Sequence, residues 1–189
     1  MFDWKRINFY WVDERCVPVE STESNFGEAE RILFDKINTL VNLHRIFGED
    51  DPYEEAERYS GILKNNLPVE KDLPLFDIIL LGMGEDGHTA SIFPDQMNLL
   101  TSDKYCEVAI HPESGQKRIT LTGKIINNAD KIIFLITGKN KSEVVKDILE
   151  KKNGNEKYPA AHITGNNGNV KWYLDKDAAG LLNIYNRII

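Results

Sequence analysis

The chain has 189 residues, 41% of them hydrophobic, and a formal net charge of −7. This length allows one α/β domain with a sizeable core. The acidic balance argues against general nucleic-acid binding, which needs a basic surface, but not against a small anionic substrate held by a few cations. No apolar run approaches the ~20 residues of a membrane helix, and no signal peptide is evident at the start. Cys16 and Cys106 stand alone, so we expect reduced thiols of a cytoplasmic protein rather than a zinc or redox motif.

The first half of the chain predicts a strand followed by two helices. Residues 7–12 (INFYWV) are β-branched and aromatic, which is typical of a strand. Ser21 and Ser24 are candidate N-caps for a helix that runs to about residue 40. A second helix begins at Asp51-Pro52, with proline well placed in the first turn. Its apolar stripe consists of Ala56, Tyr59 and Leu63.

The second half continues the alternation of strands and helices. The pattern predicts a buried strand at 76–81 (FDIILL), a short strand at 118–121, a strand at 131–137, a helix at about 141–151 and a last short helix at 175–182. Such alternation favours an α/β fold with a mostly parallel central sheet flanked by helices, which we expect to form a single domain over residues 1–189.

Three polar clusters follow predicted strands, at 13–15, 82–88 and 138–141. In parallel sheets, ligands bind beyond the carboxyl ends of the strands. The fold would therefore bring these clusters, far apart in sequence, to one edge of the sheet. This convergence is the strongest argument from residues alone for a functional site.

The segment GMGEDGHTASIFP (residues 82–94) leaves a buried strand through glycines and reaches His88. An unperturbed imidazole titrates near ~6.5 and can exchange protons at neutral pH. Asp86 could fix its tautomer and raise its basicity, and Thr89 or Ser91 could cap a helix whose N-terminus favours anions. The alternative is a plain strand-to-helix turn with a surface histidine.

Three cations flank these clusters. Arg15 could clamp a phosphate or carboxylate, or could form an internal ion pair with Asp13 or Glu14. Arg118 has the same two interpretations. Lys141 begins a predicted helix, where a cation opposes the helix dipole unless an anion is nearby. The remaining histidines, His44, His111 and His162, are expected to be structural.

These residues resemble the 6-phosphogluconolactonase family, within the superfamily of glucosamine-6-phosphate deaminase-like, ribose-5-phosphate isomerase-like and CoA-transferase-like folds. The resemblance spans nearly the whole chain. It is carried by WVDERCVP (11–18) with SNF (24–26), GMGEDGHTASIFP (82–94), KRITLT (117–122), and FLITGKNK (134–141) with VKWYLDKDAA (170–179).

The resemblance implies hydrolysis of 6-phospho-D-glucono-1,5-lactone to 6-phospho-D-gluconate in the pentose phosphate pathway, without metal or cofactor. It implies His88 as the base that activates water, with Asp86 beside it. The residues implied to bind substrate are Arg15, Arg118, Lys141, Gly84 and Gly87. The implied partner is the small sugar-phosphate lactone, with neither nucleic acid nor membrane, and with self-association possible.

One departure concerns the start of the chain. Family members usually begin with an extra strand, a Gly-Gly-Ser-Thr-Pro-like phosphate loop and a helix, which this sequence does not contain. We expect an N-terminally truncated domain that is poorly active or self-associates, because a missing strand leaves unpaired edges. The rival hypotheses are a glucosamine-6-phosphate deaminase-type isomerase and a non-catalytic sugar-phosphate binding remnant. Against the isomerase, that family tends to have Asp-Glu-Tyr where this chain has Asp13-Glu14-Arg15.

Overall fold

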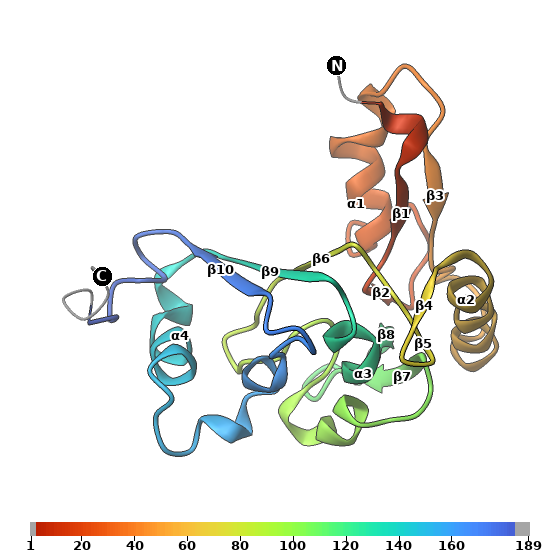
Figure 1. Ribbon diagram of the computed structural model, residues 1–189. Helices are drawn as coiled ribbons and strands as arrows, with labels where there is room; N and C mark the ends of the chain where they lie inside the picture. The colour runs from red at the N-terminus through yellow and green to blue at the C-terminus, as the bar shows by residue number, and fades with distance from the viewer. Residues whose placement is uncertain (1–2, 184–189) are drawn as a thin grey trace.

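The computed structural model describes residues 3–183 and is an α/β fold (Figure 1). Its helices and strands are β1 (Asn8–Tyr10), β2 (Asp13–Arg15), α1 (Asn25–Ile32), β3 (Asn42–His44), α2 (Pro52–Asn66), β4 (Val69–Glu70), β5 (Leu73–Pro74), β6 (Ile78–Leu81), β7 (Cys106–Ile110), β8 (Lys117–Leu121), α3 (Gly123–Asn127), β9 (Lys131–Ile136), α4 (Ser142–Leu149) and β10 (Val170–Leu174). Short 3-10 turns lie at η1 (Trp4–Arg6), η2 (Phe34–Lys36), η3 (Pro94–Leu100), η4 (Lys139–Lys141), η5 (Asn155–Lys157) and η6 (Pro159–His162).

Parallel strands form two separate sheets. One pairs β1 with β3, and the other has the order β10-β9-β6. In the larger sheet, alternate side chains point into the core, where Phe134 stacks on Trp172 with ring centroids 4.0 Å apart. Helix α4 lies beneath β9 and β10 (Figure 1). The predicted parallel sheet is confirmed.

Strand β6 is buried on one face only. Ile79 and Leu81 are buried, whereas Ile78 and Leu80 expose 53% and 56% of their surface. The expectation of a fully buried strand at 76–81 is therefore wrong for half of its side chains. A continuous apolar run is typical of a parallel strand covered on both faces, and here the second face is uncovered.

An antiparallel sheet of order β2-β8-β7, which was not predicted, lies beside the parallel strands. Helix α2 packs on β7 and β8 through the expected stripe of Ala56, Tyr59 and Leu63, all buried. The Tyr59 hydroxyl accepts from Trp11 N at 2.8 Å, which ties α2 to the chain between β1 and β2. The polar residues after the first strand are therefore themselves a strand, in a different sheet.

Two predicted helices differ from the structure. The first begins where Ser24 accepts from Gly27 N, but it ends at Ile32 rather than near residue 40. Phe34, just beyond, packs edge-on against Phe9 of β1, which draws the chain away from the helix axis. Residues 175–182 form turns instead of a helix. Strands β3, β7 and β10 and the hairpin of β4 and β5 were not anticipated.

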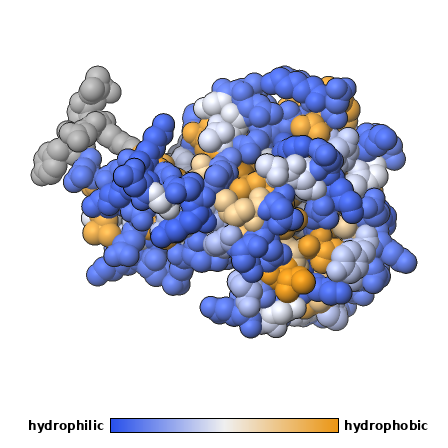
Figure 2. Space-filling model, turned by 90° about the horizontal axis from the view of Figure 1, so that it is seen from below, coloured by the Kyte–Doolittle hydropathy of each residue, from blue (hydrophilic) through white to orange (hydrophobic). Residues whose placement is uncertain are grey.

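The face seen from below is mostly hydrophilic, with apolar areas between the hydrophilic ones (Figure 2). Across residues 3–183, no helix is both long and apolar enough to cross a membrane.

Candidate active site

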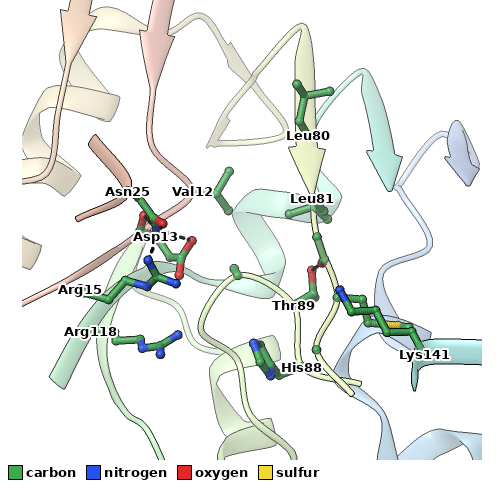
Figure 3. A pocket seen from close by; sticks show the side chains of 14 residues that line it. Val12, Asp13, Arg15, Asn25, Leu80, Leu81, His88, Thr89, Arg118 and Lys141 are labelled. Atoms are coloured by element: carbon green, nitrogen blue, oxygen red, sulfur yellow. Dashed lines mark hydrogen bonds between the residues drawn. The ribbon is translucent and has the colours of Figure 1, made fainter. Parts of the chain in front are cut away.

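A cavity of about 360 Å³ opens where the parallel and antiparallel sheets meet (Figure 3). All three polar clusters contribute to its wall. The lining residues are Val12, Asp13, Arg15, Asn25, Leu80, Leu81, Gly82, Met83, Gly84, His88, Thr89, Ala90, Arg118 and Lys141. The predicted convergence at the carboxyl ends of β6 and β9 is confirmed, and the antiparallel strands β2 and β8 complete the wall with two arginines.

His88 is held by the carboxylate two residues before it. Its Nδ1 lies 2.6 Å from Asp86 Oδ1, and the same oxygen accepts from His88 N at 3.1 Å. An ionised carboxylate can only accept, so in the neutral ring Nδ1 carries the proton and Nε2 keeps the lone pair. Within the described part of the chain, Nε2 has no hydrogen-bond partner. The ring thus presents a basic nitrogen at the cavity.

The pKa of the Asp86 carboxyl fits this role. Burial alone would raise it, but the hydrogen bonds from the His88 ring and backbone lower the pKa below its ordinary value. Asp86 therefore stays ionised when His88 gains a proton, and it would stabilise the resulting imidazolium.

Gly84 makes room for this pair. A Cβ atom on Gly84 would lie 2.2 Å from His88 Nδ1 and 2.7 Å from Asp86 Oδ1, closer than any real contact. Gly87, by contrast, does not line the cavity. It turns the chain at φ +79° with the Tyr158 ring packed against it. Of the two glycines expected near the substrate, only Gly84 is at the cavity.

Arg15 and Arg118 face the cavity from directly opposite positions on β2 and β8. Arg15 Nη1 donates to Glu23 O at 2.6 Å and to Asn25 Oδ1 at 2.8 Å. The Nε atoms of both arginines are buried without a partner. Among residues 3–183, no carboxylate forms an ion pair with either guanidinium. The alternative of an internal ion pair for Arg15 or Arg118 is therefore wrong.

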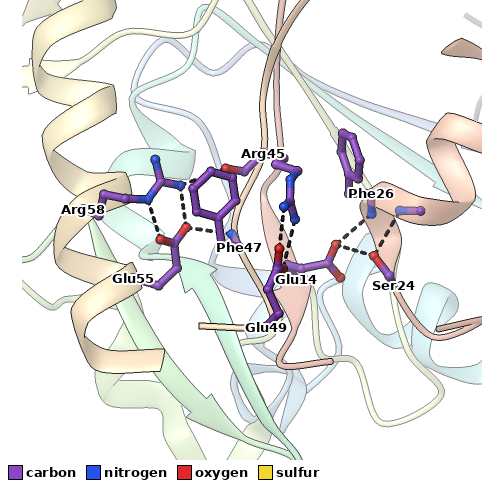
Figure 4. Close-up of polar contacts among 9 residues, drawn as sticks. Glu14, Ser24, Phe26, Arg45, Phe47, Glu49, Glu55 and Arg58 are labelled. Atoms are coloured by element: carbon purple, nitrogen blue, oxygen red, sulfur yellow. Dashed lines mark hydrogen bonds and ion pairs between the residues drawn. The ribbon is translucent and has the colours of Figure 1, made fainter. Parts of the chain in front are cut away.

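Arg15 forms no ion pair with Glu14, because the Glu14 carboxylate is hydrogen-bonded at the start of α1. Glu14 is 2% exposed and turns toward the start of α1, where it accepts from Asn25 N and Phe26 N at 2.7 Å and from the Ser24 hydroxyl at 3.1 Å (Figure 4). Helix N-termini favour carboxylates. Alternation along β2 then sends Glu14 to the helix, and Asp13 and Arg15 to the cavity.

The two guanidinium groups repel one another. Burial first, and then the charge of Arg15, lower the pKa of Arg118. An anion between them would relieve this repulsion and satisfy their free N–H groups. The pair therefore has the chemistry of a phosphate or carboxylate site.

Lys141 reaches the cavity from the opposite wall, at the end of η4 (Figure 3). Two contacts hold this segment. Asn140 donates to the Glu85 carboxylate of the His88 loop, and Gly138 N donates to Asp175 Oδ2 at 3.1 Å. The backbone that carries Lys141 is thereby tied to the loop that carries His88.

Asp13 lines the cavity, as expected for the polar cluster 13–15, although no role beyond a possible ion pair with Arg15 was predicted for it. Its Oδ2 accepts from the Ser91 hydroxyl at 2.7 Å. Side chains alternate along a strand, so Asp13 lies on the face of β2 opposite to Glu14 and on the same face as Arg15. This alternation would have placed Asp13 at the cavity if β2 had been recognised as a strand. Thr89 and Ser91 do not cap a helix: the following turn η3 has Phe93 at its N-cap and no side-chain cap.

Neither a metal cluster nor reactive thiols accompany this site. Over residues 3–183, no group of three or more His, Cys, Asp or Glu side chains could hold a metal ion. Burial raises the pKa of the Cys16 thiol to about 11 and that of Cys106 to about 12, so both are protonated at neutral pH.

Comparisons with known proteins give the family. The family model of glucosamine-6-phosphate isomerases and 6-phosphogluconolactonases matches the sequence of residues 1–172. A 6-phosphogluconolactonase from Haemophilus influenzae is 45% identical over 181 residues, which are 95% of this chain and 76% of that protein. The chain belongs to this family.

Solved structures agree with this membership. The crystal structure of a protein named devB is 46% identical, with a TM-score of 0.88 over 94% of this chain and 74% of that one. A 6-phosphogluconolactonase from Trypanosoma brucei is 32% identical, with a TM-score of 0.80 over 92% and 73%. The fold expected from the resemblance is confirmed.

The other histidines of this family member lie away from the cavity. His44 stacks on Tyr10 at 4.4 Å, His111 packs against Phe93, and His162 Nε2 lies 2.7 Å from Glu156 O. These contacts agree with the structural roles expected of them. The roles of His88, Asp86, Arg15, Arg118 and Lys141 remain predictions.

Proposed function

We propose that this chain hydrolyses 6-phospho-D-glucono-1,5-lactone to 6-phospho-D-gluconate. The observation that carries the proposal is the His88–Asp86 pair, with its 2.6 Å contact, at a cavity that also holds three cations. A lactone ester needs a base to activate water, and a phosphate needs cations. The relatives of this chain are named for this reaction. We place the reaction in the cytoplasm, in the pentose phosphate pathway, with no metal or organic cofactor.

In the first step, His88 Nε2 takes a proton from water while the water oxygen attacks C1 of the lactone. Asp86 keeps the ring oriented and stabilises the imidazolium. The C1–O double bond opens, and a tetrahedral oxyanion forms.

The oxyanion needs a fixed donor. Three N–H groups of the turn are already used: Gly84 N donates to His88 O, Gly87 N to Gly84 O, and His88 N to Asp86. Arg15 lines the cavity and is fixed there by its bonds to Glu23 and Asn25. We therefore assign the oxyanion to Arg15.

In the second step, the intermediate collapses and the bond from C1 to the ring oxygen breaks. The ring oxygen takes the proton from His88, which returns the imidazole to its neutral form. Arg118 and Lys141 would hold the phosphate and thereby place C1 at the base. The net reaction consumes one water and gives the open-chain acid.

The test is the rate of hydrolysis of freshly made lactone, measured by coupling the product to 6-phosphogluconate dehydrogenase and subtracting spontaneous hydrolysis. We expect a rate above background that falls about 10²–10⁴-fold in His88→Ala, because general-base help is lost. His162→Ala is the matched control and should keep the wild-type rate. Equal rates in His88→Ala and the wild type would rule out His88 as the base, and ammonia release from glucosamine 6-phosphate would favour the isomerase instead.

A further inference from the structure

Ser91 lies three residues after His88 and is completely buried although it is polar. Its hydroxyl donates to Asp13 Oδ2 at 2.7 Å, and its N–H donates to Thr120 Oγ1 at 3.2 Å. Asp13 and Thr120 face each other in the antiparallel pair of β2 and β8. The loop that carries His88 is thus docked, through one serine, on a single cross-strand pair.

The backbone beside Ser91 needs this support. Ala90 has φ +51°, in the left-handed region that favours glycine. The turn is closed by Ile92 N, which donates to Thr89 O at 2.9 Å, and the Thr89 hydroxyl donates to Gly82 O at 2.8 Å. A left-handed alanine persists only where the surroundings hold it. The buried bonds of Thr89 and Ser91 are what hold it here.

The docking point is two residues from the arginines. In the same antiparallel pair of strands, Arg15 and Arg118 form the cross-strand pair two positions away from Asp13 and Thr120. We infer that Asp13 and Ser91 are positioning residues, whose hydrogen bond sets the place of His88 relative to the two guanidinium groups. This inference rests on the proposed function, because it concerns the geometry of that reaction.

The cavity-facing carboxylate of Asp13 has a rival role, as a direct acceptor for substrate hydroxyls. Its Oδ2 is already bonded to Ser91, and Oδ1 has only a long 3.4 Å contact with Asn25 Nδ2. The two roles differ in what they require. Positioning requires a hydrogen-bond acceptor and the Ser91 hydroxyl, whereas substrate binding requires the Asp13 oxygens and not Ser91.

Four variants separate these roles by steady-state kinetics. We expect Ser91→Ala and Asp13→Ala each to lower kcat about tenfold with KM within about threefold, because small misplacements of a base are costly. Asp13→Asn should keep most of kcat, since its amide oxygen can still accept from Ser91. The double variant of Ser91→Ala and Asp13→Ala should be no slower than Asp13→Ala alone, because both remove the same bond.

Ser102→Ala is the matched control, because Ser102 also donates to a carboxylate, Glu107 Oε1 at 2.8 Å, but away from the cavity. It should leave kcat unchanged. A kcat for Ser91→Ala equal to that of this control would overturn the inference. So would a loss in Asp13→Asn as large as in Asp13→Ala, since the charge of Asp13 would then act beyond its bond to Ser91, on the substrate or on Arg118.

Hydrogen–deuterium exchange of the peptide spanning residues 82–93 gives a readout that needs no lactonase activity. We expect faster exchange in Ser91→Ala and Asp13→Ala, and wild-type exchange in Asp13→Asn and Ser102→Ala. If the wild type hydrolysed no lactone, the proposed function would be wrong. The exchange measurement would still show whether the hydrogen bond between Ser91 and Asp13 holds the loop that carries His88. Unchanged exchange in Ser91→Ala would refute the positioning role.

Discussion

The two walls of the cavity are built in different ways. The sheet wall consists of Arg15 and Arg118 on β2 and β8, whose positions follow from strand register. The loop wall consists of His88 and Lys141, on irregular segments held by side-chain hydrogen bonds. Backbone pairing fixes the two arginines, whereas single side-chain hydrogen bonds hold the segments that carry His88 and Lys141. The loop wall should therefore be the more easily disturbed.

Among variants that test this difference between the two walls, Gly84→Ala is expected to have the largest effect on kcat. The new Cβ would collide with His88 Nδ1 and Asp86 Oδ1, and both must shift. We expect kcat to fall about 100-fold, which is typical when a catalytic group is misplaced by about 1 Å. Steady-state lactonase assays measure this.

Gly61→Ala provides the comparison, because its Cβ would meet nothing within 4 Å on α2. It should keep the wild-type kcat. An unchanged kcat in Gly84→Ala would mean that the His88–Asp86 pair does not need its observed place.

On the sheet wall, Arg118→Ala should act on binding instead. A hydrogen bond to a charged group contributes about 2 kcal/mol, so we expect KM to rise roughly 30-fold with little change in kcat. The exposed Arg31, paired with Glu28 on α1, serves as the control when replaced by alanine. A fall in kcat at constant KM would contradict the assignment of Arg118 to ground-state anion binding.

Acid should weaken the loop wall through Asp86. The pKa of this carboxyl is lowered in the folded protein, so its stabilising contribution is fully present above its ordinary value of about 3.9 and is lost as the pH falls through the folded pKa. The half-exposed side chain limits the contribution to about 1 kcal/mol. Wild type should have a higher Tm than Asp86→Asn at pH 6, and the difference should shrink below about pH 4. A difference independent of pH would contradict this linkage.

The smallest effect is expected from Ala90→Gly. Relief of the left-handed backbone outweighs the entropy that glycine adds to the unfolded chain, for a gain of about 0.5 kcal/mol in the free energy of unfolding. Urea denaturation measures it, with Ala56→Gly inside α2 expected to change stability in the opposite direction. A loss of stability in Ala90→Gly would show that the left-handed turn is not strained.

Much of the parallel half could be predicted from the sequence. The β-branched runs that became β1 and β9, and the proline-started helix α2, have local signals that tertiary contacts did not override. His88 and Lys141 follow the predicted strands that became β6 and β9, and their common location followed because parallel strands end at one edge of a sheet.

In the antiparallel half, the predicted strand at 118–121 is confirmed as β8, but the strands that pair with it could not be predicted in the same way. Strand β2 is three polar residues long, and its pairing of Arg15 with Arg118 spans more than half of the chain. Register over such a separation leaves no periodic trace in a single sequence. The exposure of Ile78 and Leu80 was missed for a related reason, since an apolar run gives no sign of which face is covered.

The mutual repulsion of Arg15 and Arg118 has a consequence for inhibition. Any dianion that fits between the two guanidinium groups relieves that repulsion, whichever molecule carries it. The arginines therefore attract any suitable charge, whereas the chemical step needs an ester carbonyl placed between His88 and Arg15. Phosphate esters that lack such a carbonyl will bind to the same cations but offer no carbon for hydrolysis. Ordinary phosphorylated metabolites should therefore act as competitive inhibitors, through the contacts that also bind the substrate.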